Sequence, residues 1–225
     1  MRPVRSALFL PCAHRAAFPD DAGAQRRLLA RCGFPELPLL AAFCCGQPAA
    51  TAGDRDGATG MVASWREAAS RFDTVLVASA TCAGHLAAHG VGTPLVRYAP
   101  DVLIDTIRET SKAPRVPIYL HRPCHDVWDE ARWGEFERWL AATANVEILA
   151  RPFRDPCCGF GGVFSTLFDR TAGAMMEHRL AAIGAVGARA IVSAEPGCLS
   201  HFAAHANGGV PVVPLASYLV ERGIG

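Results

Sequence analysis

Cysteine is the residue type in this sequence with the clearest capacity for chemistry. Nine cysteines occur among 225 residues, and two pairs are adjacent, in the stretches FCCG (43–46) and PCCGFGG (156–162). A bridge between adjacent cysteines is strained, and an odd cysteine count without a secretory signal disfavours a disulfide scaffold. Bridges between more distant cysteines remain an alternative. In a reducing compartment such a composition favours metal or redox chemistry.

The cysteines are arranged as a repeat. The pattern C–x31–CC–x36–C in the first half recurs as C–x32–CC–x39–C in the second. The flanks also repeat, since CAGHLAAHG (82–90) matches CLSHFAAHA (198–206). Eight cysteines kept in step over such gaps predict an internal duplication. The polar stretch TSKAPR (110–115) marks the boundary, which predicts two domains over residues 1–112 and 113–225. The two sets are Cys12, Cys44, Cys45 and Cys82, and Cys124, Cys157, Cys158 and Cys198.

The elements that must position these thiols are short buried strands that alternate with helices. Short apolar runs predict strands at 7–10, 37–43, 74–79, 116–120, 146–150 and 190–194. Amphipathic or apolar helical patterns lie at 22–33, 60–72, 134–145 and 172–187. This alternation predicts an α/β fold of two similar domains related by a pseudo-two-fold axis, each a small parallel sheet flanked by helices. Each cysteine group follows a strand, so the thiols should gather at the carboxyl-end rim of each sheet.

Four thiolates that converge on one point repel each other unless a metal centre neutralises their charge. Soft thiolates suit an iron–sulfur cluster or zinc. Adjacent cysteines can reach two irons of one cluster, whereas a single zinc ion more often uses C-x2-C. The pattern therefore favours an iron–sulfur cluster, most simply [4Fe-4S]. Zinc at both sites and redox-active thiols without metal stay open as alternatives.

Glycines follow both vicinal pairs. Gly46, Gly159, Gly161 and Gly162 would allow close approach of a cluster and expose amide N–H groups. Such groups directed at sulfur raise a cluster's reduction potential. A tight turn between strand and helix is the competing interpretation. A nucleotide-phosphate loop is weaker, because GFGGVF is not G-x-G-x-x-G and no Walker lysine follows.

The repeated C…CCG…C pattern resembles the cysteine-rich CCG domain of the B-type subunits of heterodisulfide reductase and of related iron–sulfur proteins. Within that group, CCGQPA (44–49) and CCGFGG (157–162) are most similar to the lactate-utilisation A proteins, the small iron–sulfur components of three-protein L-lactate oxidation systems. The resemblance covers nearly the whole chain. It implies that the eight motif cysteines are metal ligands, and that one motif can hold zinc instead of a cluster.

One departure from that pattern concerns the end of each motif. The heterodisulfide reductase type ends in C-x-x-C, whereas this chain has His85 and His201 at the second positions. The resemblance then implies a four-thiolate cluster, or a centre with His85 or His201 as an extra ligand, rather than a five-thiolate cluster. Helix-surface histidines inherited through the duplication are the alternative. The second half keeps more of the pattern and is the expected active site.

Other polar residues flank the second motif. His121, Arg122 and His125 surround Cys124, and Arg151 and Arg154 precede the vicinal pair. Cationic or protonatable groups there could reduce thiolate repulsion and tune a reduction potential. A solvated loop is an equally good interpretation. The ninth cysteine, Cys32, lies outside both motifs and is expected to be a buried core thiol.

Composition narrows the classes of partner. The net charge is +1 at pH 7, no basic run occurs, and about half of the residues are hydrophobic. This argues against a nucleic-acid or membrane-surface partner and indicates a sizeable core. No apolar run has the roughly 18 residues of a spanning helix. The N-terminal apolar run ends at Pro11 and is too short for a good signal peptide. A cytoplasmic protein is therefore expected.

The sequence also predicts dependence on other proteins. It lacks the C-x2-C-x2-C-x3-C-P run of a ferredoxin module, a dinucleotide fingerprint and a Ser-His-Asp pattern. With the resemblance, this predicts an electron-transfer subunit of a multiprotein oxidation system for a 2-hydroxy acid, L-lactate first. Its partners would be a ferredoxin-like iron–sulfur subunit, a flavin dehydrogenase, or both. Glycolate or glycerol-3-phosphate oxidation, thiol–disulfide reduction and a zinc-bound scaffold remain alternatives.

Overall fold

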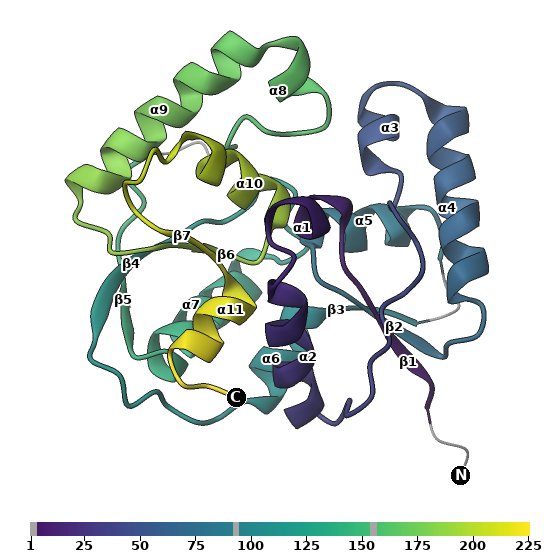
Figure 1. Cartoon of the computed structure of the whole chain (residues 1–225), viewed down its shortest axis with the longest axis horizontal. Coiled ribbons are helices and arrows are strands. Elements are labelled where there is room, and N and C mark those ends of the chain that lie inside the picture. The colour runs from purple at the N-terminus through teal and green to yellow at the C-terminus, as the bar shows by residue number, and fades with distance from the viewer. Residues whose placement is uncertain (1–3, 92–94, 154–156) are drawn as a thin grey trace.

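The computed structural model describes residues 4–91, 95–153 and 157–225. Parallel strands alternate with helices along the whole chain (Figure 1). The strands are β1 (Ser6–Phe9), β2 (Thr74–Val77), β3 (Leu95–Tyr98), β4 (Val116–Leu120), β5 (Val146–Ile148), β6 (Ile191–Ser193) and β7 (Val212–Pro214). The helices are α1 (Cys12–Ala17), α2 (Asp21–Arg31), α3 (Gln47–Thr51), α4 (Arg55–Ala69), α5 (Ala80–Ala88), α6 (Ala99–Thr106), α7 (Glu130–Thr143), α8 (Phe164–Leu167), α9 (Asp169–Ala185), α10 (Pro196–His205) and α11 (Leu215–Glu221).

Two parallel sheets with the same topology confirm the α/β class and support the duplication. The first has the order β1-β2-β3, and the second has the order β5-β4-β6-β7. On the free side of β1, Leu8 forms one parallel bridge with Leu39. The segment around Leu39 therefore takes the place in the first sheet that β5 takes in the second.

The prediction of a strand over 37–43 is wrong, because that segment forms only this single bridge. Leu8 N–H donates to the Pro38 carbonyl at 2.9 Å, and Leu40 N–H donates to the Leu8 carbonyl at 2.8 Å. Pro38 has no N–H with which to continue the ladder toward the start of β1. The other predicted strands and helices are present, with ends shifted by a few residues.

Side-chain caps explain where two of the longer helices, α4 and α7, begin. The Asp54 side chain accepts from Gly57 N–H at 2.8 Å, and the Asp129 side chain accepts from Arg132 N–H at 2.8 Å. These are N-caps of α4 and α7. On α4 the buried residues recur at helical spacing and reach Trp65, which packs edge-to-face on Phe9 of β1.

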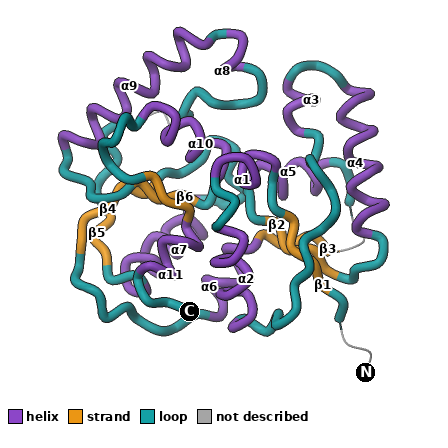
Figure 2. Tube along the Cα trace, in the orientation of Figure 1, coloured by secondary structure: helices purple, strands orange, loops and turns teal. Residues whose placement is uncertain are grey.

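The main hydrophobic core runs through both halves, and a second, smaller cluster of buried residues lies in the second half. A continuous cluster of buried residues includes β1 and β2 of the first half and also Trp133 of α7 and Leu219 of α11. Helix α11 packs on α2 of the other half, and Figure 2 shows helices between the two groups of strands. The boundary between 112 and 113 remains a prediction, since the packing does not separate two cores at that point.

The loops after the strands bring the amino ends of several helices together. Helix α1 packs beside α10, and both lie near α5 in Figure 1. Each of these helices begins soon after β1, β6 or β2 and carries a motif cysteine. Over the residues described, no helix has both the length and the apolar character needed to cross a membrane.

Candidate metal centre

All eight motif cysteines line one cavity between the two halves. The cavity holds about 720 Å³ of empty space, counting its part open to solvent. The sequence predicts a cysteine group at the rim of each half, and the structure turns these two rims toward each other. The cysteines that line the cavity are Cys12, Cys44, Cys45, Cys82, Cys124, Cys157, Cys158 and Cys198. Cys45, Cys82, Cys158 and Cys198 are buried, whereas Cys124 is exposed.

In the first half the four thiols form a connected chain. Cys44 is hydrogen-bonded to Cys12 and to its neighbour Cys45, and Cys45 is also hydrogen-bonded to Cys82. These bonds, from Cys12 first, lower the pKa of Cys44 to about 2 against the effect of burial. The same contacts raise the pKa values of Cys12 and Cys45. Cys44 is thus the thiol of this group whose pKa is lowered, and it is hydrogen-bonded to two neighbouring thiols.

In the second half the thiol with the lowered pKa is the second member of the vicinal pair, Cys158. The hydrogen bond from Cys198 lowers the pKa of Cys158 to about 3 despite burial, and the nearby His121 and His201 add to this effect. Burial and the neighbouring Cys157 raise the pKa of Cys124 to about 11. The equivalent thiols of the two halves therefore lie in different electrostatic environments.

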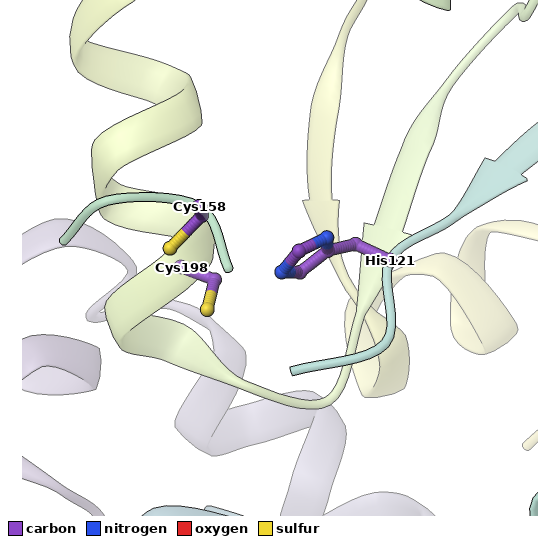
Figure 3. Close-up of side chains that lie close together, drawn as sticks. All are labelled: His121, Cys158 and Cys198. Carbon is purple, nitrogen blue, oxygen red and sulfur yellow. The ribbon is translucent and has the colours of Figure 1, made fainter. Parts of the chain in front are cut away.

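His121 stands directly beside this second group. Ligand atoms of His121, Cys158 and Cys198 all lie within 4.8 Å of one another (Figure 3). The imidazole follows β4 and is 1% exposed. From its place in the sequence beside Cys124, His121 is expected only to tune the properties of the thiols. The sequence feature that points to a closer role is the alignment of the two repeats, in which His121 stands where the first half has Phe9.

A pair of equivalent residues links the helices that carry the last cysteine of each motif. Ser79 precedes Cys82 by three positions, as Glu195 precedes Cys198. The Ser79 hydroxyl donates to the Glu195 carboxylate, 2.9 Å from Oε2, and the Thr81 N–H donates to it at 3.1 Å. Glu195 also accepts from Gly197 N–H at 3.4 Å and is the N-cap of α10, whereas Ser79 is the N-cap of α5. Burial raises the pKa of this carboxyl, which sequence reasoning did not single out.

The glycines after each pair have definite local roles. Gly46 and Gly159 donate backbone N–H groups to the sulfurs of Cys44 and Cys157, both at 3.4 Å. A Cβ on Gly46, at φ 96°, would lie 2.9 Å from the Ala58 carbonyl oxygen. Gly162 lies at φ 58° against Thr51 of α3. Gly161 has open space around it and lines the cavity.

The predicted histidine ligands are buried but differ in their contacts. His85 has a buried Nε2 without a hydrogen-bond partner among the described residues, and burial and His89 lower its pKa. The Nδ1 of His201 lies 3.1 Å from the Cys158 carbonyl oxygen. His89 and His205 contact the carbonyls of His85 and His201 in the same way, each at 3.0 Å. Ligation by His85 and His201 remains a prediction.

Two arginines that flank the second motif, Arg122 and Arg151, make their contacts away from the cysteines. Arg122 pairs with Asp126 and Glu130, and its guanidinium lies over the Trp133 ring. Arg151 also lies over Trp133, and Arg154 falls outside the described residues. His125 lines the cavity beside Cys124. The ninth cysteine, Cys32, is partly buried against the core, and burial raises its pKa.

Comparison with protein families agrees with this geometry. The cysteine-rich CCG domain matches twice, over residues 6–87 and 118–203. The chain belongs to the CCG cysteine-rich domain family. Each matched region contains one complete set of four motif cysteines, so the CCG family signature and the cavity lining coincide.

Curated relatives of this CCG protein match over most of its length. It is 26% identical over 222 residues to Lactate utilization protein A of Geobacillus thermodenitrificans, which covers 87% of this chain and 89% of the relative. It is 22% identical to Lactate utilization protein A 2 of Bacillus cereus strain Q1 over 219 residues, with 87% and 88% coverage. Lactate utilization protein A 1 of Bacillus anthracis strain CDC 684 is 22% identical with the same coverage.

Proposed function

We propose that this CCG protein is an iron–sulfur electron-transfer subunit of a multiprotein L-lactate oxidation system. The observation that carries the proposal is the shared cavity, because eight thiols from two motifs converge on it. An iron–sulfur cluster held there would supply one-electron transfer. The ligands would be Cys12, Cys44, Cys45 and Cys82 in one half and Cys124, Cys157, Cys158 and Cys198 in the other.

The donor set fits a thiophilic metal. Soft thiolates select iron–sulfur clusters or zinc, whereas magnesium and calcium require several oxygen ligands. Glu195 is the acidic residue among the described cavity-lining residues, and its oxygens already accept from Ser79, Thr81 and Gly197. The chemistry of the lining therefore favours a sulfur-bound centre and disfavours an oxygen-bound cation.

The residues around the thiols suit a redox role. Gly46 and Gly159 direct N–H groups at sulfur, and such hydrogen bonds stabilise a reduced centre. Four of the eight thiols are buried, so water has little access to them. Glu195 and Ser79 hold α5 and α10 in a fixed relation, which keeps Cys82 and Cys198 in place.

The lactate assignment is supported by the names and coverage of the relatives. Their shared name implies a system of several proteins for this chain as well. The partners we propose are a ferredoxin-like iron–sulfur subunit, a flavin dehydrogenase, or both, and the proposed compartment is the cytoplasm.

The redox assignment is tested on protein purified without oxygen. Absorption and EPR spectra before and after dithionite should show a centre that is bleached and becomes paramagnetic on reduction. Cys158→Ser should lose or alter one centre, whereas Cys32→Ser, outside both motifs, should leave the spectra unchanged. A colourless protein with no response to dithionite would overturn the proposal.

The substrate assignment is tested by growth. A strain that lacks the gene for this chain should fail to grow on L-lactate and grow normally on pyruvate. The wild-type gene should restore growth, and the Cys158→Ser gene should not. Normal growth of the deletion strain on L-lactate, with a defect on glycolate or glycerol 3-phosphate, would move the assignment to those substrates.

A further inference from the structure

His121 is fixed in place at the end of β4. The backbone N–H of His121 donates to the Val192 carbonyl at 2.8 Å, and its backbone carbonyl accepts from the Ser193 hydroxyl at 3.0 Å. The ring contacts Phe202, with centroids 5.1 Å apart, and points toward the sulfurs of Cys158 and Cys198 in Figure 3. The backbone and the aromatic neighbour therefore hold the imidazole against the cysteine group.

Within the part of the chain that the structure describes, neither ring nitrogen of His121 has a well-formed hydrogen bond, and the ring makes at most a weak contact with the Cys158 sulfur. Nearly all buried polar groups in proteins have a partner, and an unpaired one is costly. The groups that the ring faces are thiols, which together with an imidazole make a common metal-ligand set. A metal ion bound between them would satisfy the nitrogen that faces the sulfurs.

The repeat provides an internal control for this position. His121 precedes Cys124 by three residues, and Phe9 precedes Cys12 by three. Phe9 is fully buried and packs edge-to-face on Trp65, with centroids 5.9 Å apart. The fold thus accepts an apolar ring here, and packing alone does not require an imidazole in the second half.

The other histidine of the second half is engaged differently. The Nδ1 of His201 lies against the Cys158 carbonyl oxygen. His121, in contrast, has ligand atoms within 4.8 Å of two thiols, and no equivalent grouping with a histidine is found in the first half among the residues described. The two cysteine groups therefore differ in the nitrogen donor beside them.

We propose that His121 is a nitrogen ligand of the metal centre held by Cys158 and Cys198. The inference rests on the proposed function, since it assumes a metal at the second motif. Where His121 binds, one of the four thiolates named above as ligands does not, and a neutral imidazole in place of a negative thiolate raises the reduction potential of an iron–sulfur centre. The second centre would then have the higher reduction potential of the two and would accept electrons from the first.

The test uses pulsed EPR on the anaerobic, dithionite-reduced full chain with 15N-labelled histidine. The wild type should show the strong nitrogen coupling of a directly bonded imidazole. His121→Phe and His121→Cys should abolish this coupling, and His201→Phe and the exposed His178→Phe should retain it. His121→Cys should keep the centre, with a lower midpoint potential in a redox titration.

Several outcomes would overturn the inference while leaving the proposed function intact. These are a cluster without strong nitrogen coupling, a coupling that survives in His121→Phe, or one that disappears in His201→Phe. If zinc is bound instead, the electron-transfer proposal fails. Zinc-edge X-ray absorption on the same variants then decides the inference, by whether nitrogen scattering is lost in His121→Phe and kept in His201→Phe.

Folding is checked separately in metal-free protein. His121→Phe should give an unchanged far-UV circular dichroism spectrum, as Phe9 occupies the equivalent site, and a urea midpoint at least as high as that of the wild type. Metal should raise the midpoint of the wild type more than that of His121→Phe. An equal increase in both would contradict ligation by His121.

Discussion

At the residue scale, the turn after the second vicinal pair depends on backbone conformations that glycine adopts easily. Gly162 lies at φ 58°, and a Cβ there would approach the Thr51 Cβ to 2.7 Å. A Cβ on the neighbouring Gly161 would have nothing within 4 Å, and the φ of Gly161 is not positive. Two adjacent glycines on the cavity wall thus face very different steric demands.

We predict that Gly162→Ala lowers the free energy of unfolding by about 1–2 kcal/mol, the cost of a left-handed conformation for a residue with a Cβ. Gly161→Ala is the matched control and should change it by less than about 0.5 kcal/mol. Urea denaturation of the two variants measures both values. Equal effects of the two substitutions would contradict the described turn.

At the element scale, one carboxylate joins helices from the two halves. Asp21 at the start of α2 accepts from the Ser217 N–H of α11 at 2.8 Å, and the His14 Nε2 of α1 lies 2.6 Å from its Oδ2. Burial alone would raise the pKa of Asp21. The hydrogen bonds with His14, Ser217 and Gln25 outweigh burial and hold this pKa below its ordinary value of 3.8.

The lowered pKa of Asp21 determines in which direction the stability of the protein changes with pH. A carboxyl with a depressed pKa in the folded state stabilises the protein above its unfolded pKa, and this stabilisation is lost as pH falls through the folded pKa. Asp21→Asn should therefore lower the free energy of unfolding at pH 7, by about 1–3 kcal/mol. The difference from wild type should shrink below about pH 4.

Urea denaturation of wild type and Asp21→Asn between pH 3 and pH 7 measures this difference. Asp20→Asn, at the exposed neighbouring position, serves as the control and should follow the wild type. A difference that grows toward low pH would contradict the lowered pKa of Asp21.

Much of this element-scale description follows from the sequence. Apolar runs placed β1, β2, β4, β5 and β6 within a few residues, and the cysteine spacing indicated the duplication. The prediction of a strand at 37–43 is wrong because a hydrophobic pattern takes no account of the missing N–H of Pro38. The convergence of both cysteine groups on one cavity rests on long-range contacts, such as those of Ser79 with Glu195, which no local pattern encodes. The sequence around Cys124 includes His121, but the contrast of this position with Phe9 is apparent only when the two repeats are aligned.

At the scale of the whole molecule, the halves are similar in fold but are not independent in packing. The main core runs through both, and the cavity takes lining residues from both. Arg222 near the chain end also donates to the carbonyls of Ala113 and Pro114 in the linking segment. The duplication thus produces one structural unit with a site at the junction of its halves.

We predict a single cooperative thermal unfolding transition for the whole chain, because separation of the halves would expose the shared core. Differential scanning calorimetry should give one peak, with a calorimetric enthalpy equal to the van't Hoff enthalpy. Two resolved transitions, one for each half, would contradict the shared core and support independent domains over 1–112 and 113–225.

The central claim is that the eight thiols at this junction bind iron–sulfur clusters. The most direct measurement is the iron, acid-labile sulfide and zinc content of the anaerobically purified chain. The account predicts brown protein with about four irons and four sulfides for each occupied four-thiolate site. Stoichiometric zinc without acid-labile sulfide would contradict it and leave a zinc-bound scaffold as the function.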